Sequence, residues 1–288
     1  MAIKTVTILG VGLIGGSFGL ALKKYGFRGR ILGVSSERTI QAAIEKKAID
    51  QGLPLAEGVA QADLVYLAQP IGRILELLPE VRRSAASHAL VTDAGSTKQQ
   101  ITGRAAELFP EGAGGPWFLG GHPMAGSQQR GVERADPDLF QNATYALTPP
   151  GDRLPESEVT TEFLAWIGKI GAKQLVLTPE THDAIVTWTS HLPQLLSTAL
   201  GATLHAQIKD PAHLQVAGLG LRDMTRLAES PFAIWKDIID SNQGNLDAAL
   251  ASCIAELEKI RERLGDPALE EQFEAARELR RKLNLQSG

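Results

Sequence analysis

His122 is the residue whose neighbours best suit it for chemistry. It lies in LGGHPMAGSQQRG, residues 119–131, with two glycines before it and a proline after it. The glycines let a ligand approach the backbone closely, and the proline ends the extended segment. A neutral imidazole can accept an alcohol proton while a hydride leaves the same carbon, as a dehydrogenase requires. The alternative is a structural loop histidine.

A second chemical signal is the glycine pattern in ILGVGLIGGS, residues 8–17. Gly10, Gly12 and Gly15 form GxGxxG directly after a predicted strand and at the start of a predicted helix. These glycines allow a tight turn, close approach of a pyrophosphate and close helix-strand packing, with the helix N-terminus facing the phosphates. We expect them to bind a dinucleotide together with Leu13 and Ile14.

The residues after the second predicted strand bear on the choice of cofactor. An acid there usually holds the adenosine ribose hydroxyls of NAD, but Val34 is followed by Ser35 and Ser36, with Arg38 close by. Hydroxyls and a guanidinium accept a 2′-phosphate, which a carboxylate repels. The cofactor is therefore NAD(P), with NADP slightly favoured over NAD. Alternatively, Glu37 reaches the ribose and NAD is used.

The elements that position these residues change in type near residue 178. Before it, short apolar segments alternate with predicted helices at 38–47, 71–81 and 156–170. The segments are KTVTILG, RILGV, DLVYLAQ, ALVTD, WFLGGH, TYALT and QLVLT. This alternation predicts an α/β fold, a Rossmann-type doubly wound parallel sheet with helices on both faces. We assign residues 1–178 to a dinucleotide-binding domain.

The remaining chain, residues 179–288, is predicted to be an all-helical substrate and dimerisation domain. Thr178 is a plausible N-cap, with Pro179 at the first helical position, and helices are expected at 180–204, 246–264 and 269–283. Leu250, Ile254 and Leu257 recur at helical spacing among charged residues. Such a stripe is either core or a dimer seam.

Polar residues follow three predicted strands, at the edge where open parallel sheets bind ligands. They are Pro70 after LVYLAQ, Asp93 and Ser96 in VTDAGSTK, and His122. We expect Pro70 and Asp93 to contact the cofactor. Ser96 and His122 would then place a hydroxyl and an imidazole over one reacting carbon.

Composition excludes several classes of partner. The net charge of -4 gives no electrostatic basis for binding nucleic acid or an anionic membrane. Cys253 is the only cysteine, which fits a reducing compartment, and the uncharged run at 5–22 contains too many glycines for a signal peptide or a membrane span. A cytoplasmic location is expected. The scattered histidines show no metal-ligand spacing, so no metal is expected.

Five segments together resemble the prephenate and arogenate dehydrogenases of tyrosine biosynthesis. They are GVGLIGGS, DAGSTK, GGHPMAGS, THDAIVTWTSHLP and GLRDMTRLAESPFAIWKDII. The resemblance runs from Lys4 to about Leu264, and the GGHPMAGS and LRDMTR segments carry most of its specificity. It implies a helical carboxyl-terminal domain that forms a homodimer.

The resemblance also implies roles for individual residues. The histidine matching His122 accepts a hydrogen bond from the ring hydroxyl of the substrate, and the serine matching Ser96 orients both groups. The arginine matching Arg226 binds a substrate carboxylate. The further substrate-binding positions are Arg222, which adds positive charge, His191 and Asp183, which shape the pocket, Trp235, which closes it, and Gln194, where relatives carry another polar group.

The implied reaction is the NAD(P)-dependent oxidative decarboxylation of prephenate to 4-hydroxyphenylpyruvate and CO2. Oxidation of the ring alcohol gives a dienone that can accept the electrons released by decarboxylation, so the protein mainly positions the ring, accepts a proton and binds the anion. Prephenate is favoured over L-arogenate because no acid beyond Asp183 is placed for an ammonium group. Arogenate dehydrogenase and a cyclohexadienyl dehydrogenase of dual specificity stay open as alternatives.

Two more distant functions fit these residues less well. A β-hydroxy acid dehydrogenase usually depends on a lysine on the first long interdomain helix, and residues 180–206 contain none. A non-catalytic NAD(P)-sensing dimer leaves His122, Ser96 and Arg226 without a joint purpose.

Overall fold

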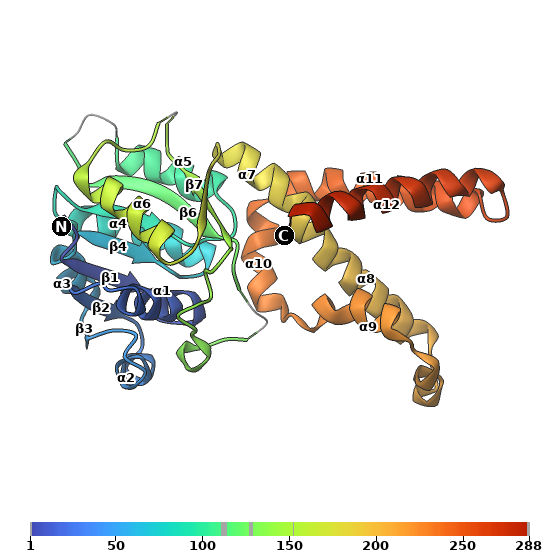
Figure 1. Ribbon diagram of the computed structural model, residues 1–288, viewed down its shortest axis with the longest axis horizontal. Helices are drawn as coiled ribbons and strands as arrows, with labels where there is room; N and C mark the ends of the chain where they lie inside the picture. The colour runs from blue at the N-terminus through green and yellow to red at the C-terminus, as the bar shows by residue number, and fades with distance from the viewer. Residues whose placement is uncertain (1, 111–113, 127–128, 152, 287–288) are drawn as a thin grey trace. The chain divides into compact units, whose positions relative to one another are not determined.

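The computed structural model describes residues 2–110, 114–126, 129–151 and 153–286, which form two compact units (Figure 1). The first unit is Met1–Asn242 and the second is Gln243–Gly288. The domain boundary expected after residue 178 lies inside the first unit and stays a prediction.

An eight-stranded sheet forms the centre of the first unit, in the order β3-β2-β1-β4-β5-β6-β7-β8. Its strands are β1 (Thr5–Leu9), β2 (Arg30–Val34), β3 (Gln51–Gly52), β4 (Leu64–Leu67), β5 (Leu90–Asp93), β6 (Trp117–Pro123), β7 (Thr144–Thr148) and β8 (Lys173–Val176). The predicted strands are all present, and the two-residue β3 is an addition that is too short to leave a pattern.

One strand pair departs from the predicted parallel arrangement. β7 pairs antiparallel with β6, with His122 opposite Ala146, whereas β7 and β8 are parallel to each other. In the described residues between β6 and β7, the structure shows only the short 3-10 turn η1 (Val132–Arg134), in place of the crossover helix that joins parallel neighbours. The mostly parallel Rossmann-type sheet is confirmed, and its β7–β8 edge runs in the opposite direction.

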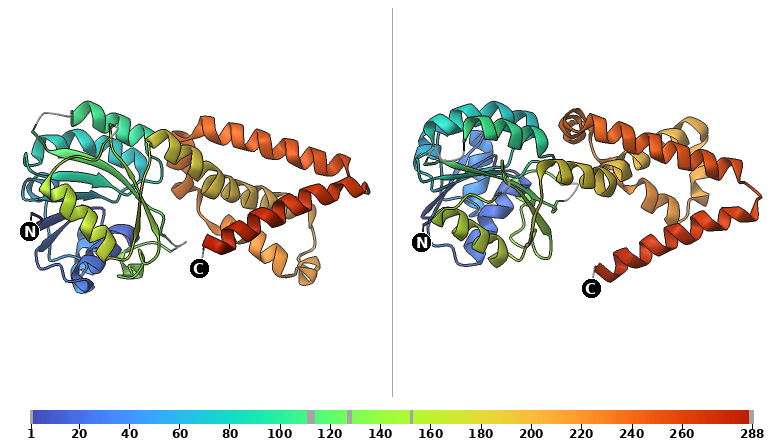
Figure 2. Two further views of the ribbon diagram at one scale, coloured as in Figure 1. Left: turned by 45° about the horizontal axis from the view of Figure 1, so that its top comes forward. Right: turned by 90° about the horizontal axis from the view of Figure 1, so that it is seen from above.

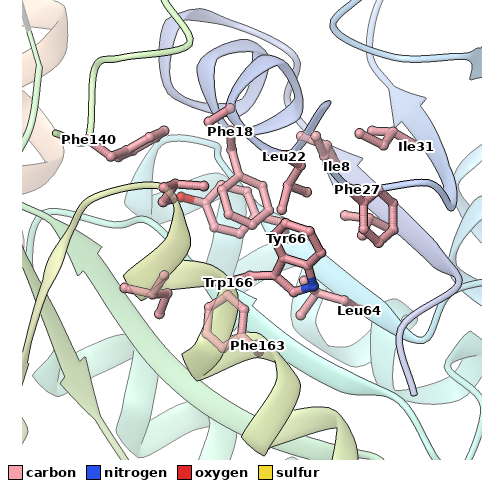
Figure 3. Packing of buried hydrophobic residues seen from close by; sticks show 14 of the residues in the cluster. Ile8, Phe18, Leu22, Phe27, Ile31, Leu64, Tyr66, Phe140, Phe163 and Trp166 are labelled. Carbon is pink, nitrogen blue, oxygen red and sulfur yellow. The ribbon is translucent and has the colours of Figure 1, made fainter. Parts of the chain in front are cut away.

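Helices cover both faces of the sheet (Figure 2). They are α1 (Leu13–Lys24), α2 (Glu37–Glu45), α3 (Leu55–Ala60), α4 (Ile71–Ser84), α5 (Gln99–Leu108) and α6 (Glu158–Lys169). Alternate residues of β4 enter opposite cores: Tyr66 stacks on Phe18 of α1 with ring centroids 4.1 Å apart (Figure 3), whereas Val65 packs in the cluster that contains Ile74 of α4. Burial on both faces explains why the strand segments read as continuous apolar runs.

The helical part of the first unit begins with a long stretch formed by α7 (Pro179–Val186), the π-helical turn η2 (Thr187–His191) and α8 (Leu192–Gln207). Thr178 caps α7 as predicted, since its hydroxyl accepts from Thr181 N–H at 3.1 Å. The sequence predicted one continuous helix here, but the structure has the wider π-helical turn η2 within it. We attribute this turn to Pro193 in the first turn of α8, because proline lacks the N–H that a regular α-helical hydrogen bond needs. π-Helical turns of this kind are frequent at functional sites.

Short elements follow α8 and complete the first unit. They are η3 (Pro211–Val216), α9 (Leu219–Thr225), η4 (Arg226–Glu229) and α10 (Phe232–Ser241). From residue 179 to 286 the structure contains no strand, as the sequence predicted. No helix in the described ranges combines the length and the apolar character that crossing a bilayer requires.

The second unit consists of two long helices, α11 (Gln243–Glu262) and α12 (Glu270–Gln286), joined through η5 (Pro267–Leu269). Its apolar stripe is not the core of a single chain, because Ile254 and Leu257 are 55% and 56% exposed. Phe273 and Leu279 of α12 are exposed as well. The dimer-seam interpretation of the stripe therefore fits this structure better than the core interpretation.

Candidate active site

The glycine fingerprint forms the turn between β1 and α1. Gly10 has φ +94°, and a methyl group added to it would lie 2.3 Å from the carbonyl oxygen of Ala68. A methyl group at Gly15 would lie 2.2 Å from Gly10 O, so this glycine permits close helix-strand packing. Gly12 is the N-cap of α1 and supplies no side-chain cap. The helix N-terminus therefore presents N–H groups to a phosphate.

Two hollows of about 410 and 460 Å³ lie beside this turn, each of a size typical for small-molecule sites. They share Gly12, Ala68, Gln69 and Gly131, so they form one groove along the carboxyl ends of β1 and β4. The predicted cofactor residues Gly10, Gly12, Ser35 and Arg38 line the first hollow, which we call the adenosine-side hollow because Ser35 and Arg38 are expected at the adenosine ribose. The predicted residues Gly12, Leu13, Ile14, Pro70 and Ser96 line the second, which we call the nicotinamide-side hollow because Ser96 is expected at the reacting carbon. The residues that line this groove are chemically suited to a dinucleotide.

Ser36 has a different place from the one predicted. It is the N-cap of α2, where its hydroxyl accepts from Thr39 N–H at 3.4 Å and bonds Thr39 Oγ1 at 2.9 Å. Of the two serines, only Ser35 lines the adenosine-side hollow. A serine at the start of a helix commonly takes this capping role.

Asp93 also lies inside the protein and not in the groove. Its carboxylate is fully buried, pairs with the equally buried ammonium of Lys98, and accepts from Gly95 N–H at 2.8 Å and Gly121 N–H at 3.1 Å. Lys98 Nζ donates in turn to Gly121 O at 2.7 Å. The pair thus fixes the peptide before His122 and the turn that carries Ser96. The Asp93 side chain therefore supports the backbone around His122 and Ser96 from inside the protein. The cofactor contact predicted for Asp93 is not seen.

A chain of hydrogen bonds connects His122 to a buried carboxylate. His122 Nδ1 lies 2.9 Å from His182 Nε2, and His182 Nδ1 lies 2.7 Å from Asp183 Oδ1. Asp183 also accepts the N–H groups of Lys98 at 2.7 Å and Gln99 at 2.9 Å, at the N-terminus of α5. His182 and Asp183 are both buried. Asp183 therefore holds His182 in position, and His182 in turn contacts His122.

This chain fits one tautomer of His122. An ionised carboxylate only accepts hydrogen bonds, so His182 donates from Nδ1 to Asp183, and in a neutral His182 ring Nε2 then has the lone pair. His122 then donates from Nδ1 to that lone pair. Its own Nε2 is left unprotonated and can accept a proton from a ligand. The arrangement sets the basic tautomer required by a dehydrogenase.

The electrostatics keep His122 neutral. Burial lowers its pKa well below the ordinary 6.5, and His182, Lys98 and His191 lower it further. Burial also lowers the pKa of His191 to about 4, against the opposing charge of Asp183. Both rings are therefore uncharged at neutral pH, and His122 is ready to take up a proton.

His191 and Trp235 contact each other through their rings, and a shared substrate pocket for them stays a prediction. The ring centroids are 5.9 Å apart and the planes nearly perpendicular. Asn242 Nδ2 lies 3.3 Å from His191 Nδ1 and holds that ring from the other side. Within the described chain, Trp235 Nε1 is buried without a hydrogen-bond partner. A buried indole N–H of this kind is suited to a ligand acceptor.

Gln194 is directed toward the backbone that carries Arg226. Its amide donates to Leu227 O at 2.9 Å, and Ser197 Oγ accepts from Ala228 N–H at 3.1 Å, so α8 holds η4 in place. Arg226 begins η4 and Arg222 lies in α9, both with exposed side chains. Neither lines the two hollows of the groove. Gln194 therefore supports the loop of Arg226, and a substrate contact for it stays a prediction.

Sequence reasoning missed three contributors. His182 is adjacent to Asp183, but only the fold brings it to His122, 60 positions away. Asp237 of α10 accepts from Gly72 N–H at 2.9 Å and lines the nicotinamide-side hollow, so α10 forms a wall of the groove. Glu133 lines the adenosine-side hollow. Ser127 of GGHPMAGS lies outside the described residues.

Comparisons with known proteins identify the family of this chain. Residues 18–182 match the family described as "Prephenate dehydrogenase, nucleotide-binding domain", and residues 178–279 match "Prephenate dehydrogenase, dimerization domain". A prephenate dehydrogenase of Bacillus subtilis (strain 168) is 35% identical over 261 residues, covering 89% of this chain and 69% of the relative.

Solved structures show the same likeness. The prephenate dehydrogenase from A. aeolicus, in complex with hydroxyphenyl propionate and NAD+, has a TM-score of 0.87 and 28% identity, covering 97% of this chain and 98% of that one. The arogenate dehydrogenase of Synechocystis has a TM-score of 0.80 and 28% identity over 97% of this chain and 99% of its own. This chain belongs to the prephenate dehydrogenase family.

Proposed function

We propose that the chain is a cytoplasmic, NAD(P)-dependent prephenate dehydrogenase that converts prephenate to 4-hydroxyphenylpyruvate and CO2. The observation that carries this proposal is the hydrogen-bond chain from Asp183 through His182 to His122. It ends in a neutral imidazole with a free lone pair on Nε2, and Asp93 links the backbone before His122 to the turn of Ser96 beside the groove.

Each residue has a defined task in this reaction. A nicotinamide dinucleotide bound in the groove supplies the hydride acceptor. His122 Nε2 accepts the proton of the ring hydroxyl, and the imidazole is held in place by His182, which the buried Asp183 carboxylate orients. Ser96, which lines the nicotinamide-side hollow, orients the hydroxyl. Arg226 binds a substrate carboxylate.

The choice between prephenate and L-arogenate concerns a keto oxygen or an ammonium group far from the reacting carbon. Both oxygens of Asp183 are engaged inside the protein, so this acid does not pair with an ammonium. That favours prephenate. The likeness to the Synechocystis arogenate dehydrogenase makes arogenate the second candidate.

The proposal is tested by following NAD(P)H absorbance with both substrates side by side. A higher kcat/KM for prephenate, with 4-hydroxyphenylpyruvate as product, is the expected result. A higher value for arogenate would replace the substrate assignment and keep the reaction class. No NAD(P)H formation with either substrate would contradict the proposed function.

Replacing Arg226 with alanine is expected to raise the KM for prephenate by about 10- to 100-fold. Such an increase corresponds to the loss of a charge-assisted hydrogen bond to a carboxylate. The Kd of the dinucleotide should not change, because Arg226 does not line the groove. Arg104→Ala is the matched control, since Arg104 forms an exposed ion pair with Glu107 on α5. Equal KM values for the two variants would remove Arg226 from the substrate site.

A homodimer is the proposed assembly. The match to a dimerization domain covers residues 178–279, and Leu257 and Phe273 of the second unit expose 56% and 64% of their surface. Sedimentation is expected to give twice the mass of one chain. Leu257→Glu combined with Phe273→Glu should shift the equilibrium toward the monomer, because charges then face a surface that excludes water. A wild-type monomer at micromolar concentration would contradict this assembly.

A further inference from the structure

The adenosine-side hollow has an acidic wall that the nucleotide fingerprint does not predict. Ser35, Arg38 and Thr39 line it from the β2–α2 side, and residues 131–133 line it from the β6–β7 connection. A methyl group added to Gly131 would lie 2.4 Å from Glu133 Oε2. The Glu133 carboxylate therefore lies directly over Gly131, which lines both hollows of the groove.

The turn that carries Glu133 is held on three sides. Lys46 Nζ at the end of α2 donates to Glu133 O at 2.6 Å, and Asp136 N–H donates to Ser17 Oγ of α1 at 2.9 Å. Val132 is 1% exposed and belongs to the core cluster under α1. These contacts fix the backbone of Glu133 against both helices that border the dinucleotide groove.

We propose that Glu133 is the carboxylate that recognises the adenosine ribose and, with Arg38, determines the choice between NAD and NADP. A carboxylate accepts hydrogen bonds from the free ribose hydroxyls of NAD and repels the 2′-phosphate of NADP, and a guanidinium favours that phosphate. Glu37, the acid nearest to the end of β2, does not line the hollow. The β6–β7 connection thus supplies the acid that the second strand lacks, and it acts against the NADP preference expected from Arg38.

The experiment measures the binding of NADH and NADPH by nicotinamide fluorescence, without substrate. In Glu133→Gln the affinity for NADPH relative to NADH is expected to rise about tenfold, which matches the loss of one charge-assisted contact. Arg38→Gln should move the ratio in the opposite direction. Glu37→Gln is the matched control, because it removes a nearby charge that does not face the groove, and its ratio should equal that of the wild type.

An unchanged ratio in folded Glu133→Gln overturns the proposal, as does a shifted ratio in Glu37→Gln. If Glu133→Gln does not fold, Glu133→Ala provides the same test with a smaller side chain. The inference rests on the proposed function only for the presence of a nicotinamide dinucleotide. If prephenate is not turned over, the proposed function is wrong, but the NADPH-to-NADH affinity ratios can still be measured. The two failures are therefore distinguishable.

Discussion

The His122→Asn variant is expected to lose about a hundredfold or more in kcat and to bind NADH as tightly as the wild type. Loss of a general base typically has an effect of this size. Asparagine has no ring nitrogen that can accept the substrate proton, whereas the dinucleotide groove is lined by other residues. Stopped-flow measurement of NAD(P)H formation and fluorescence titration of NADH separate the two quantities.

The pH dependence provides a second readout of the same role. His122 must be neutral to accept a proton, so kcat/KM falls as the pH drops through its pKa. Burial and the neighbouring His182, Lys98 and His191 lower that pKa. The decrease of kcat/KM on the acid side of the pH profile (the acid limb) therefore lies below pH 6.5 in the wild type. This decrease should be absent from the residual activity of His122→Asn. His88→Asn is the matched control, because His88 is exposed and pairs with Asp63.

Variants of His182 distinguish a positioning role from a purely structural one. Leucine breaks the bonds to both His122 and Asp183, whereas the glutamine amide can still donate to Asp183 and accept from His122. His182→Gln should retain more of kcat than His182→Leu. In both variants the acid limb should move toward higher pH, because His182 no longer lowers the pKa of His122. An unaltered pH profile together with full kcat in His182→Leu would exclude the relay.

Local sequence predicted the parts of the candidate site that are formed by residues close together in the chain. Gly10 and Gly12 lie within one strand-turn-helix unit, and Ser35 and Arg38 follow the strand beside it, so residues close in sequence line the same hollow. The seven longer strands were predictable for the same reason. The antiparallel direction of β7 was not, because the residues within a strand do not encode the direction in which it pairs.

Long-range contacts account for what the sequence did not predict. His182 reaches His122 only because α7 packs beside α5 and β7. Asp93 was expected at the cofactor because it ends a strand at the binding edge, yet its side chain is buried with Lys98, five positions later. A strand-end position indicates the right edge of the sheet but not the direction of the side chain. Glu133 lies in the β6–β7 connection beyond the end of the GGHPMAGS segment, where no motif is recognised.

The Lys98→Met variant is expected to lower the free energy of unfolding by about 3–5 kcal/mol, the usual cost of leaving one buried charge without its partner. Lys98 and Asp93 are both fully buried, so the Asp93 carboxylate loses its charged partner inside the protein. Burial lowers the pKa of Lys98, whereas the charge of Asp93 opposes that shift. Denaturant unfolding measures the loss directly.

Lys236→Met is the matched control for this variant. Lys236 pairs with Asp240 on the surface of α10, with 61% of its side chain exposed, and exposed pairs of this kind contribute little to stability. Equal midpoints for the two variants would contradict a buried ion pair. The double variant Asp93→Asn with Lys98→Met should recover part of the loss, because no unpaired charge then stays inside. Where Lys98→Met remains folded, the acid limb of kcat/KM should move upward, since the ammonium that lowers the pKa of His122 is gone.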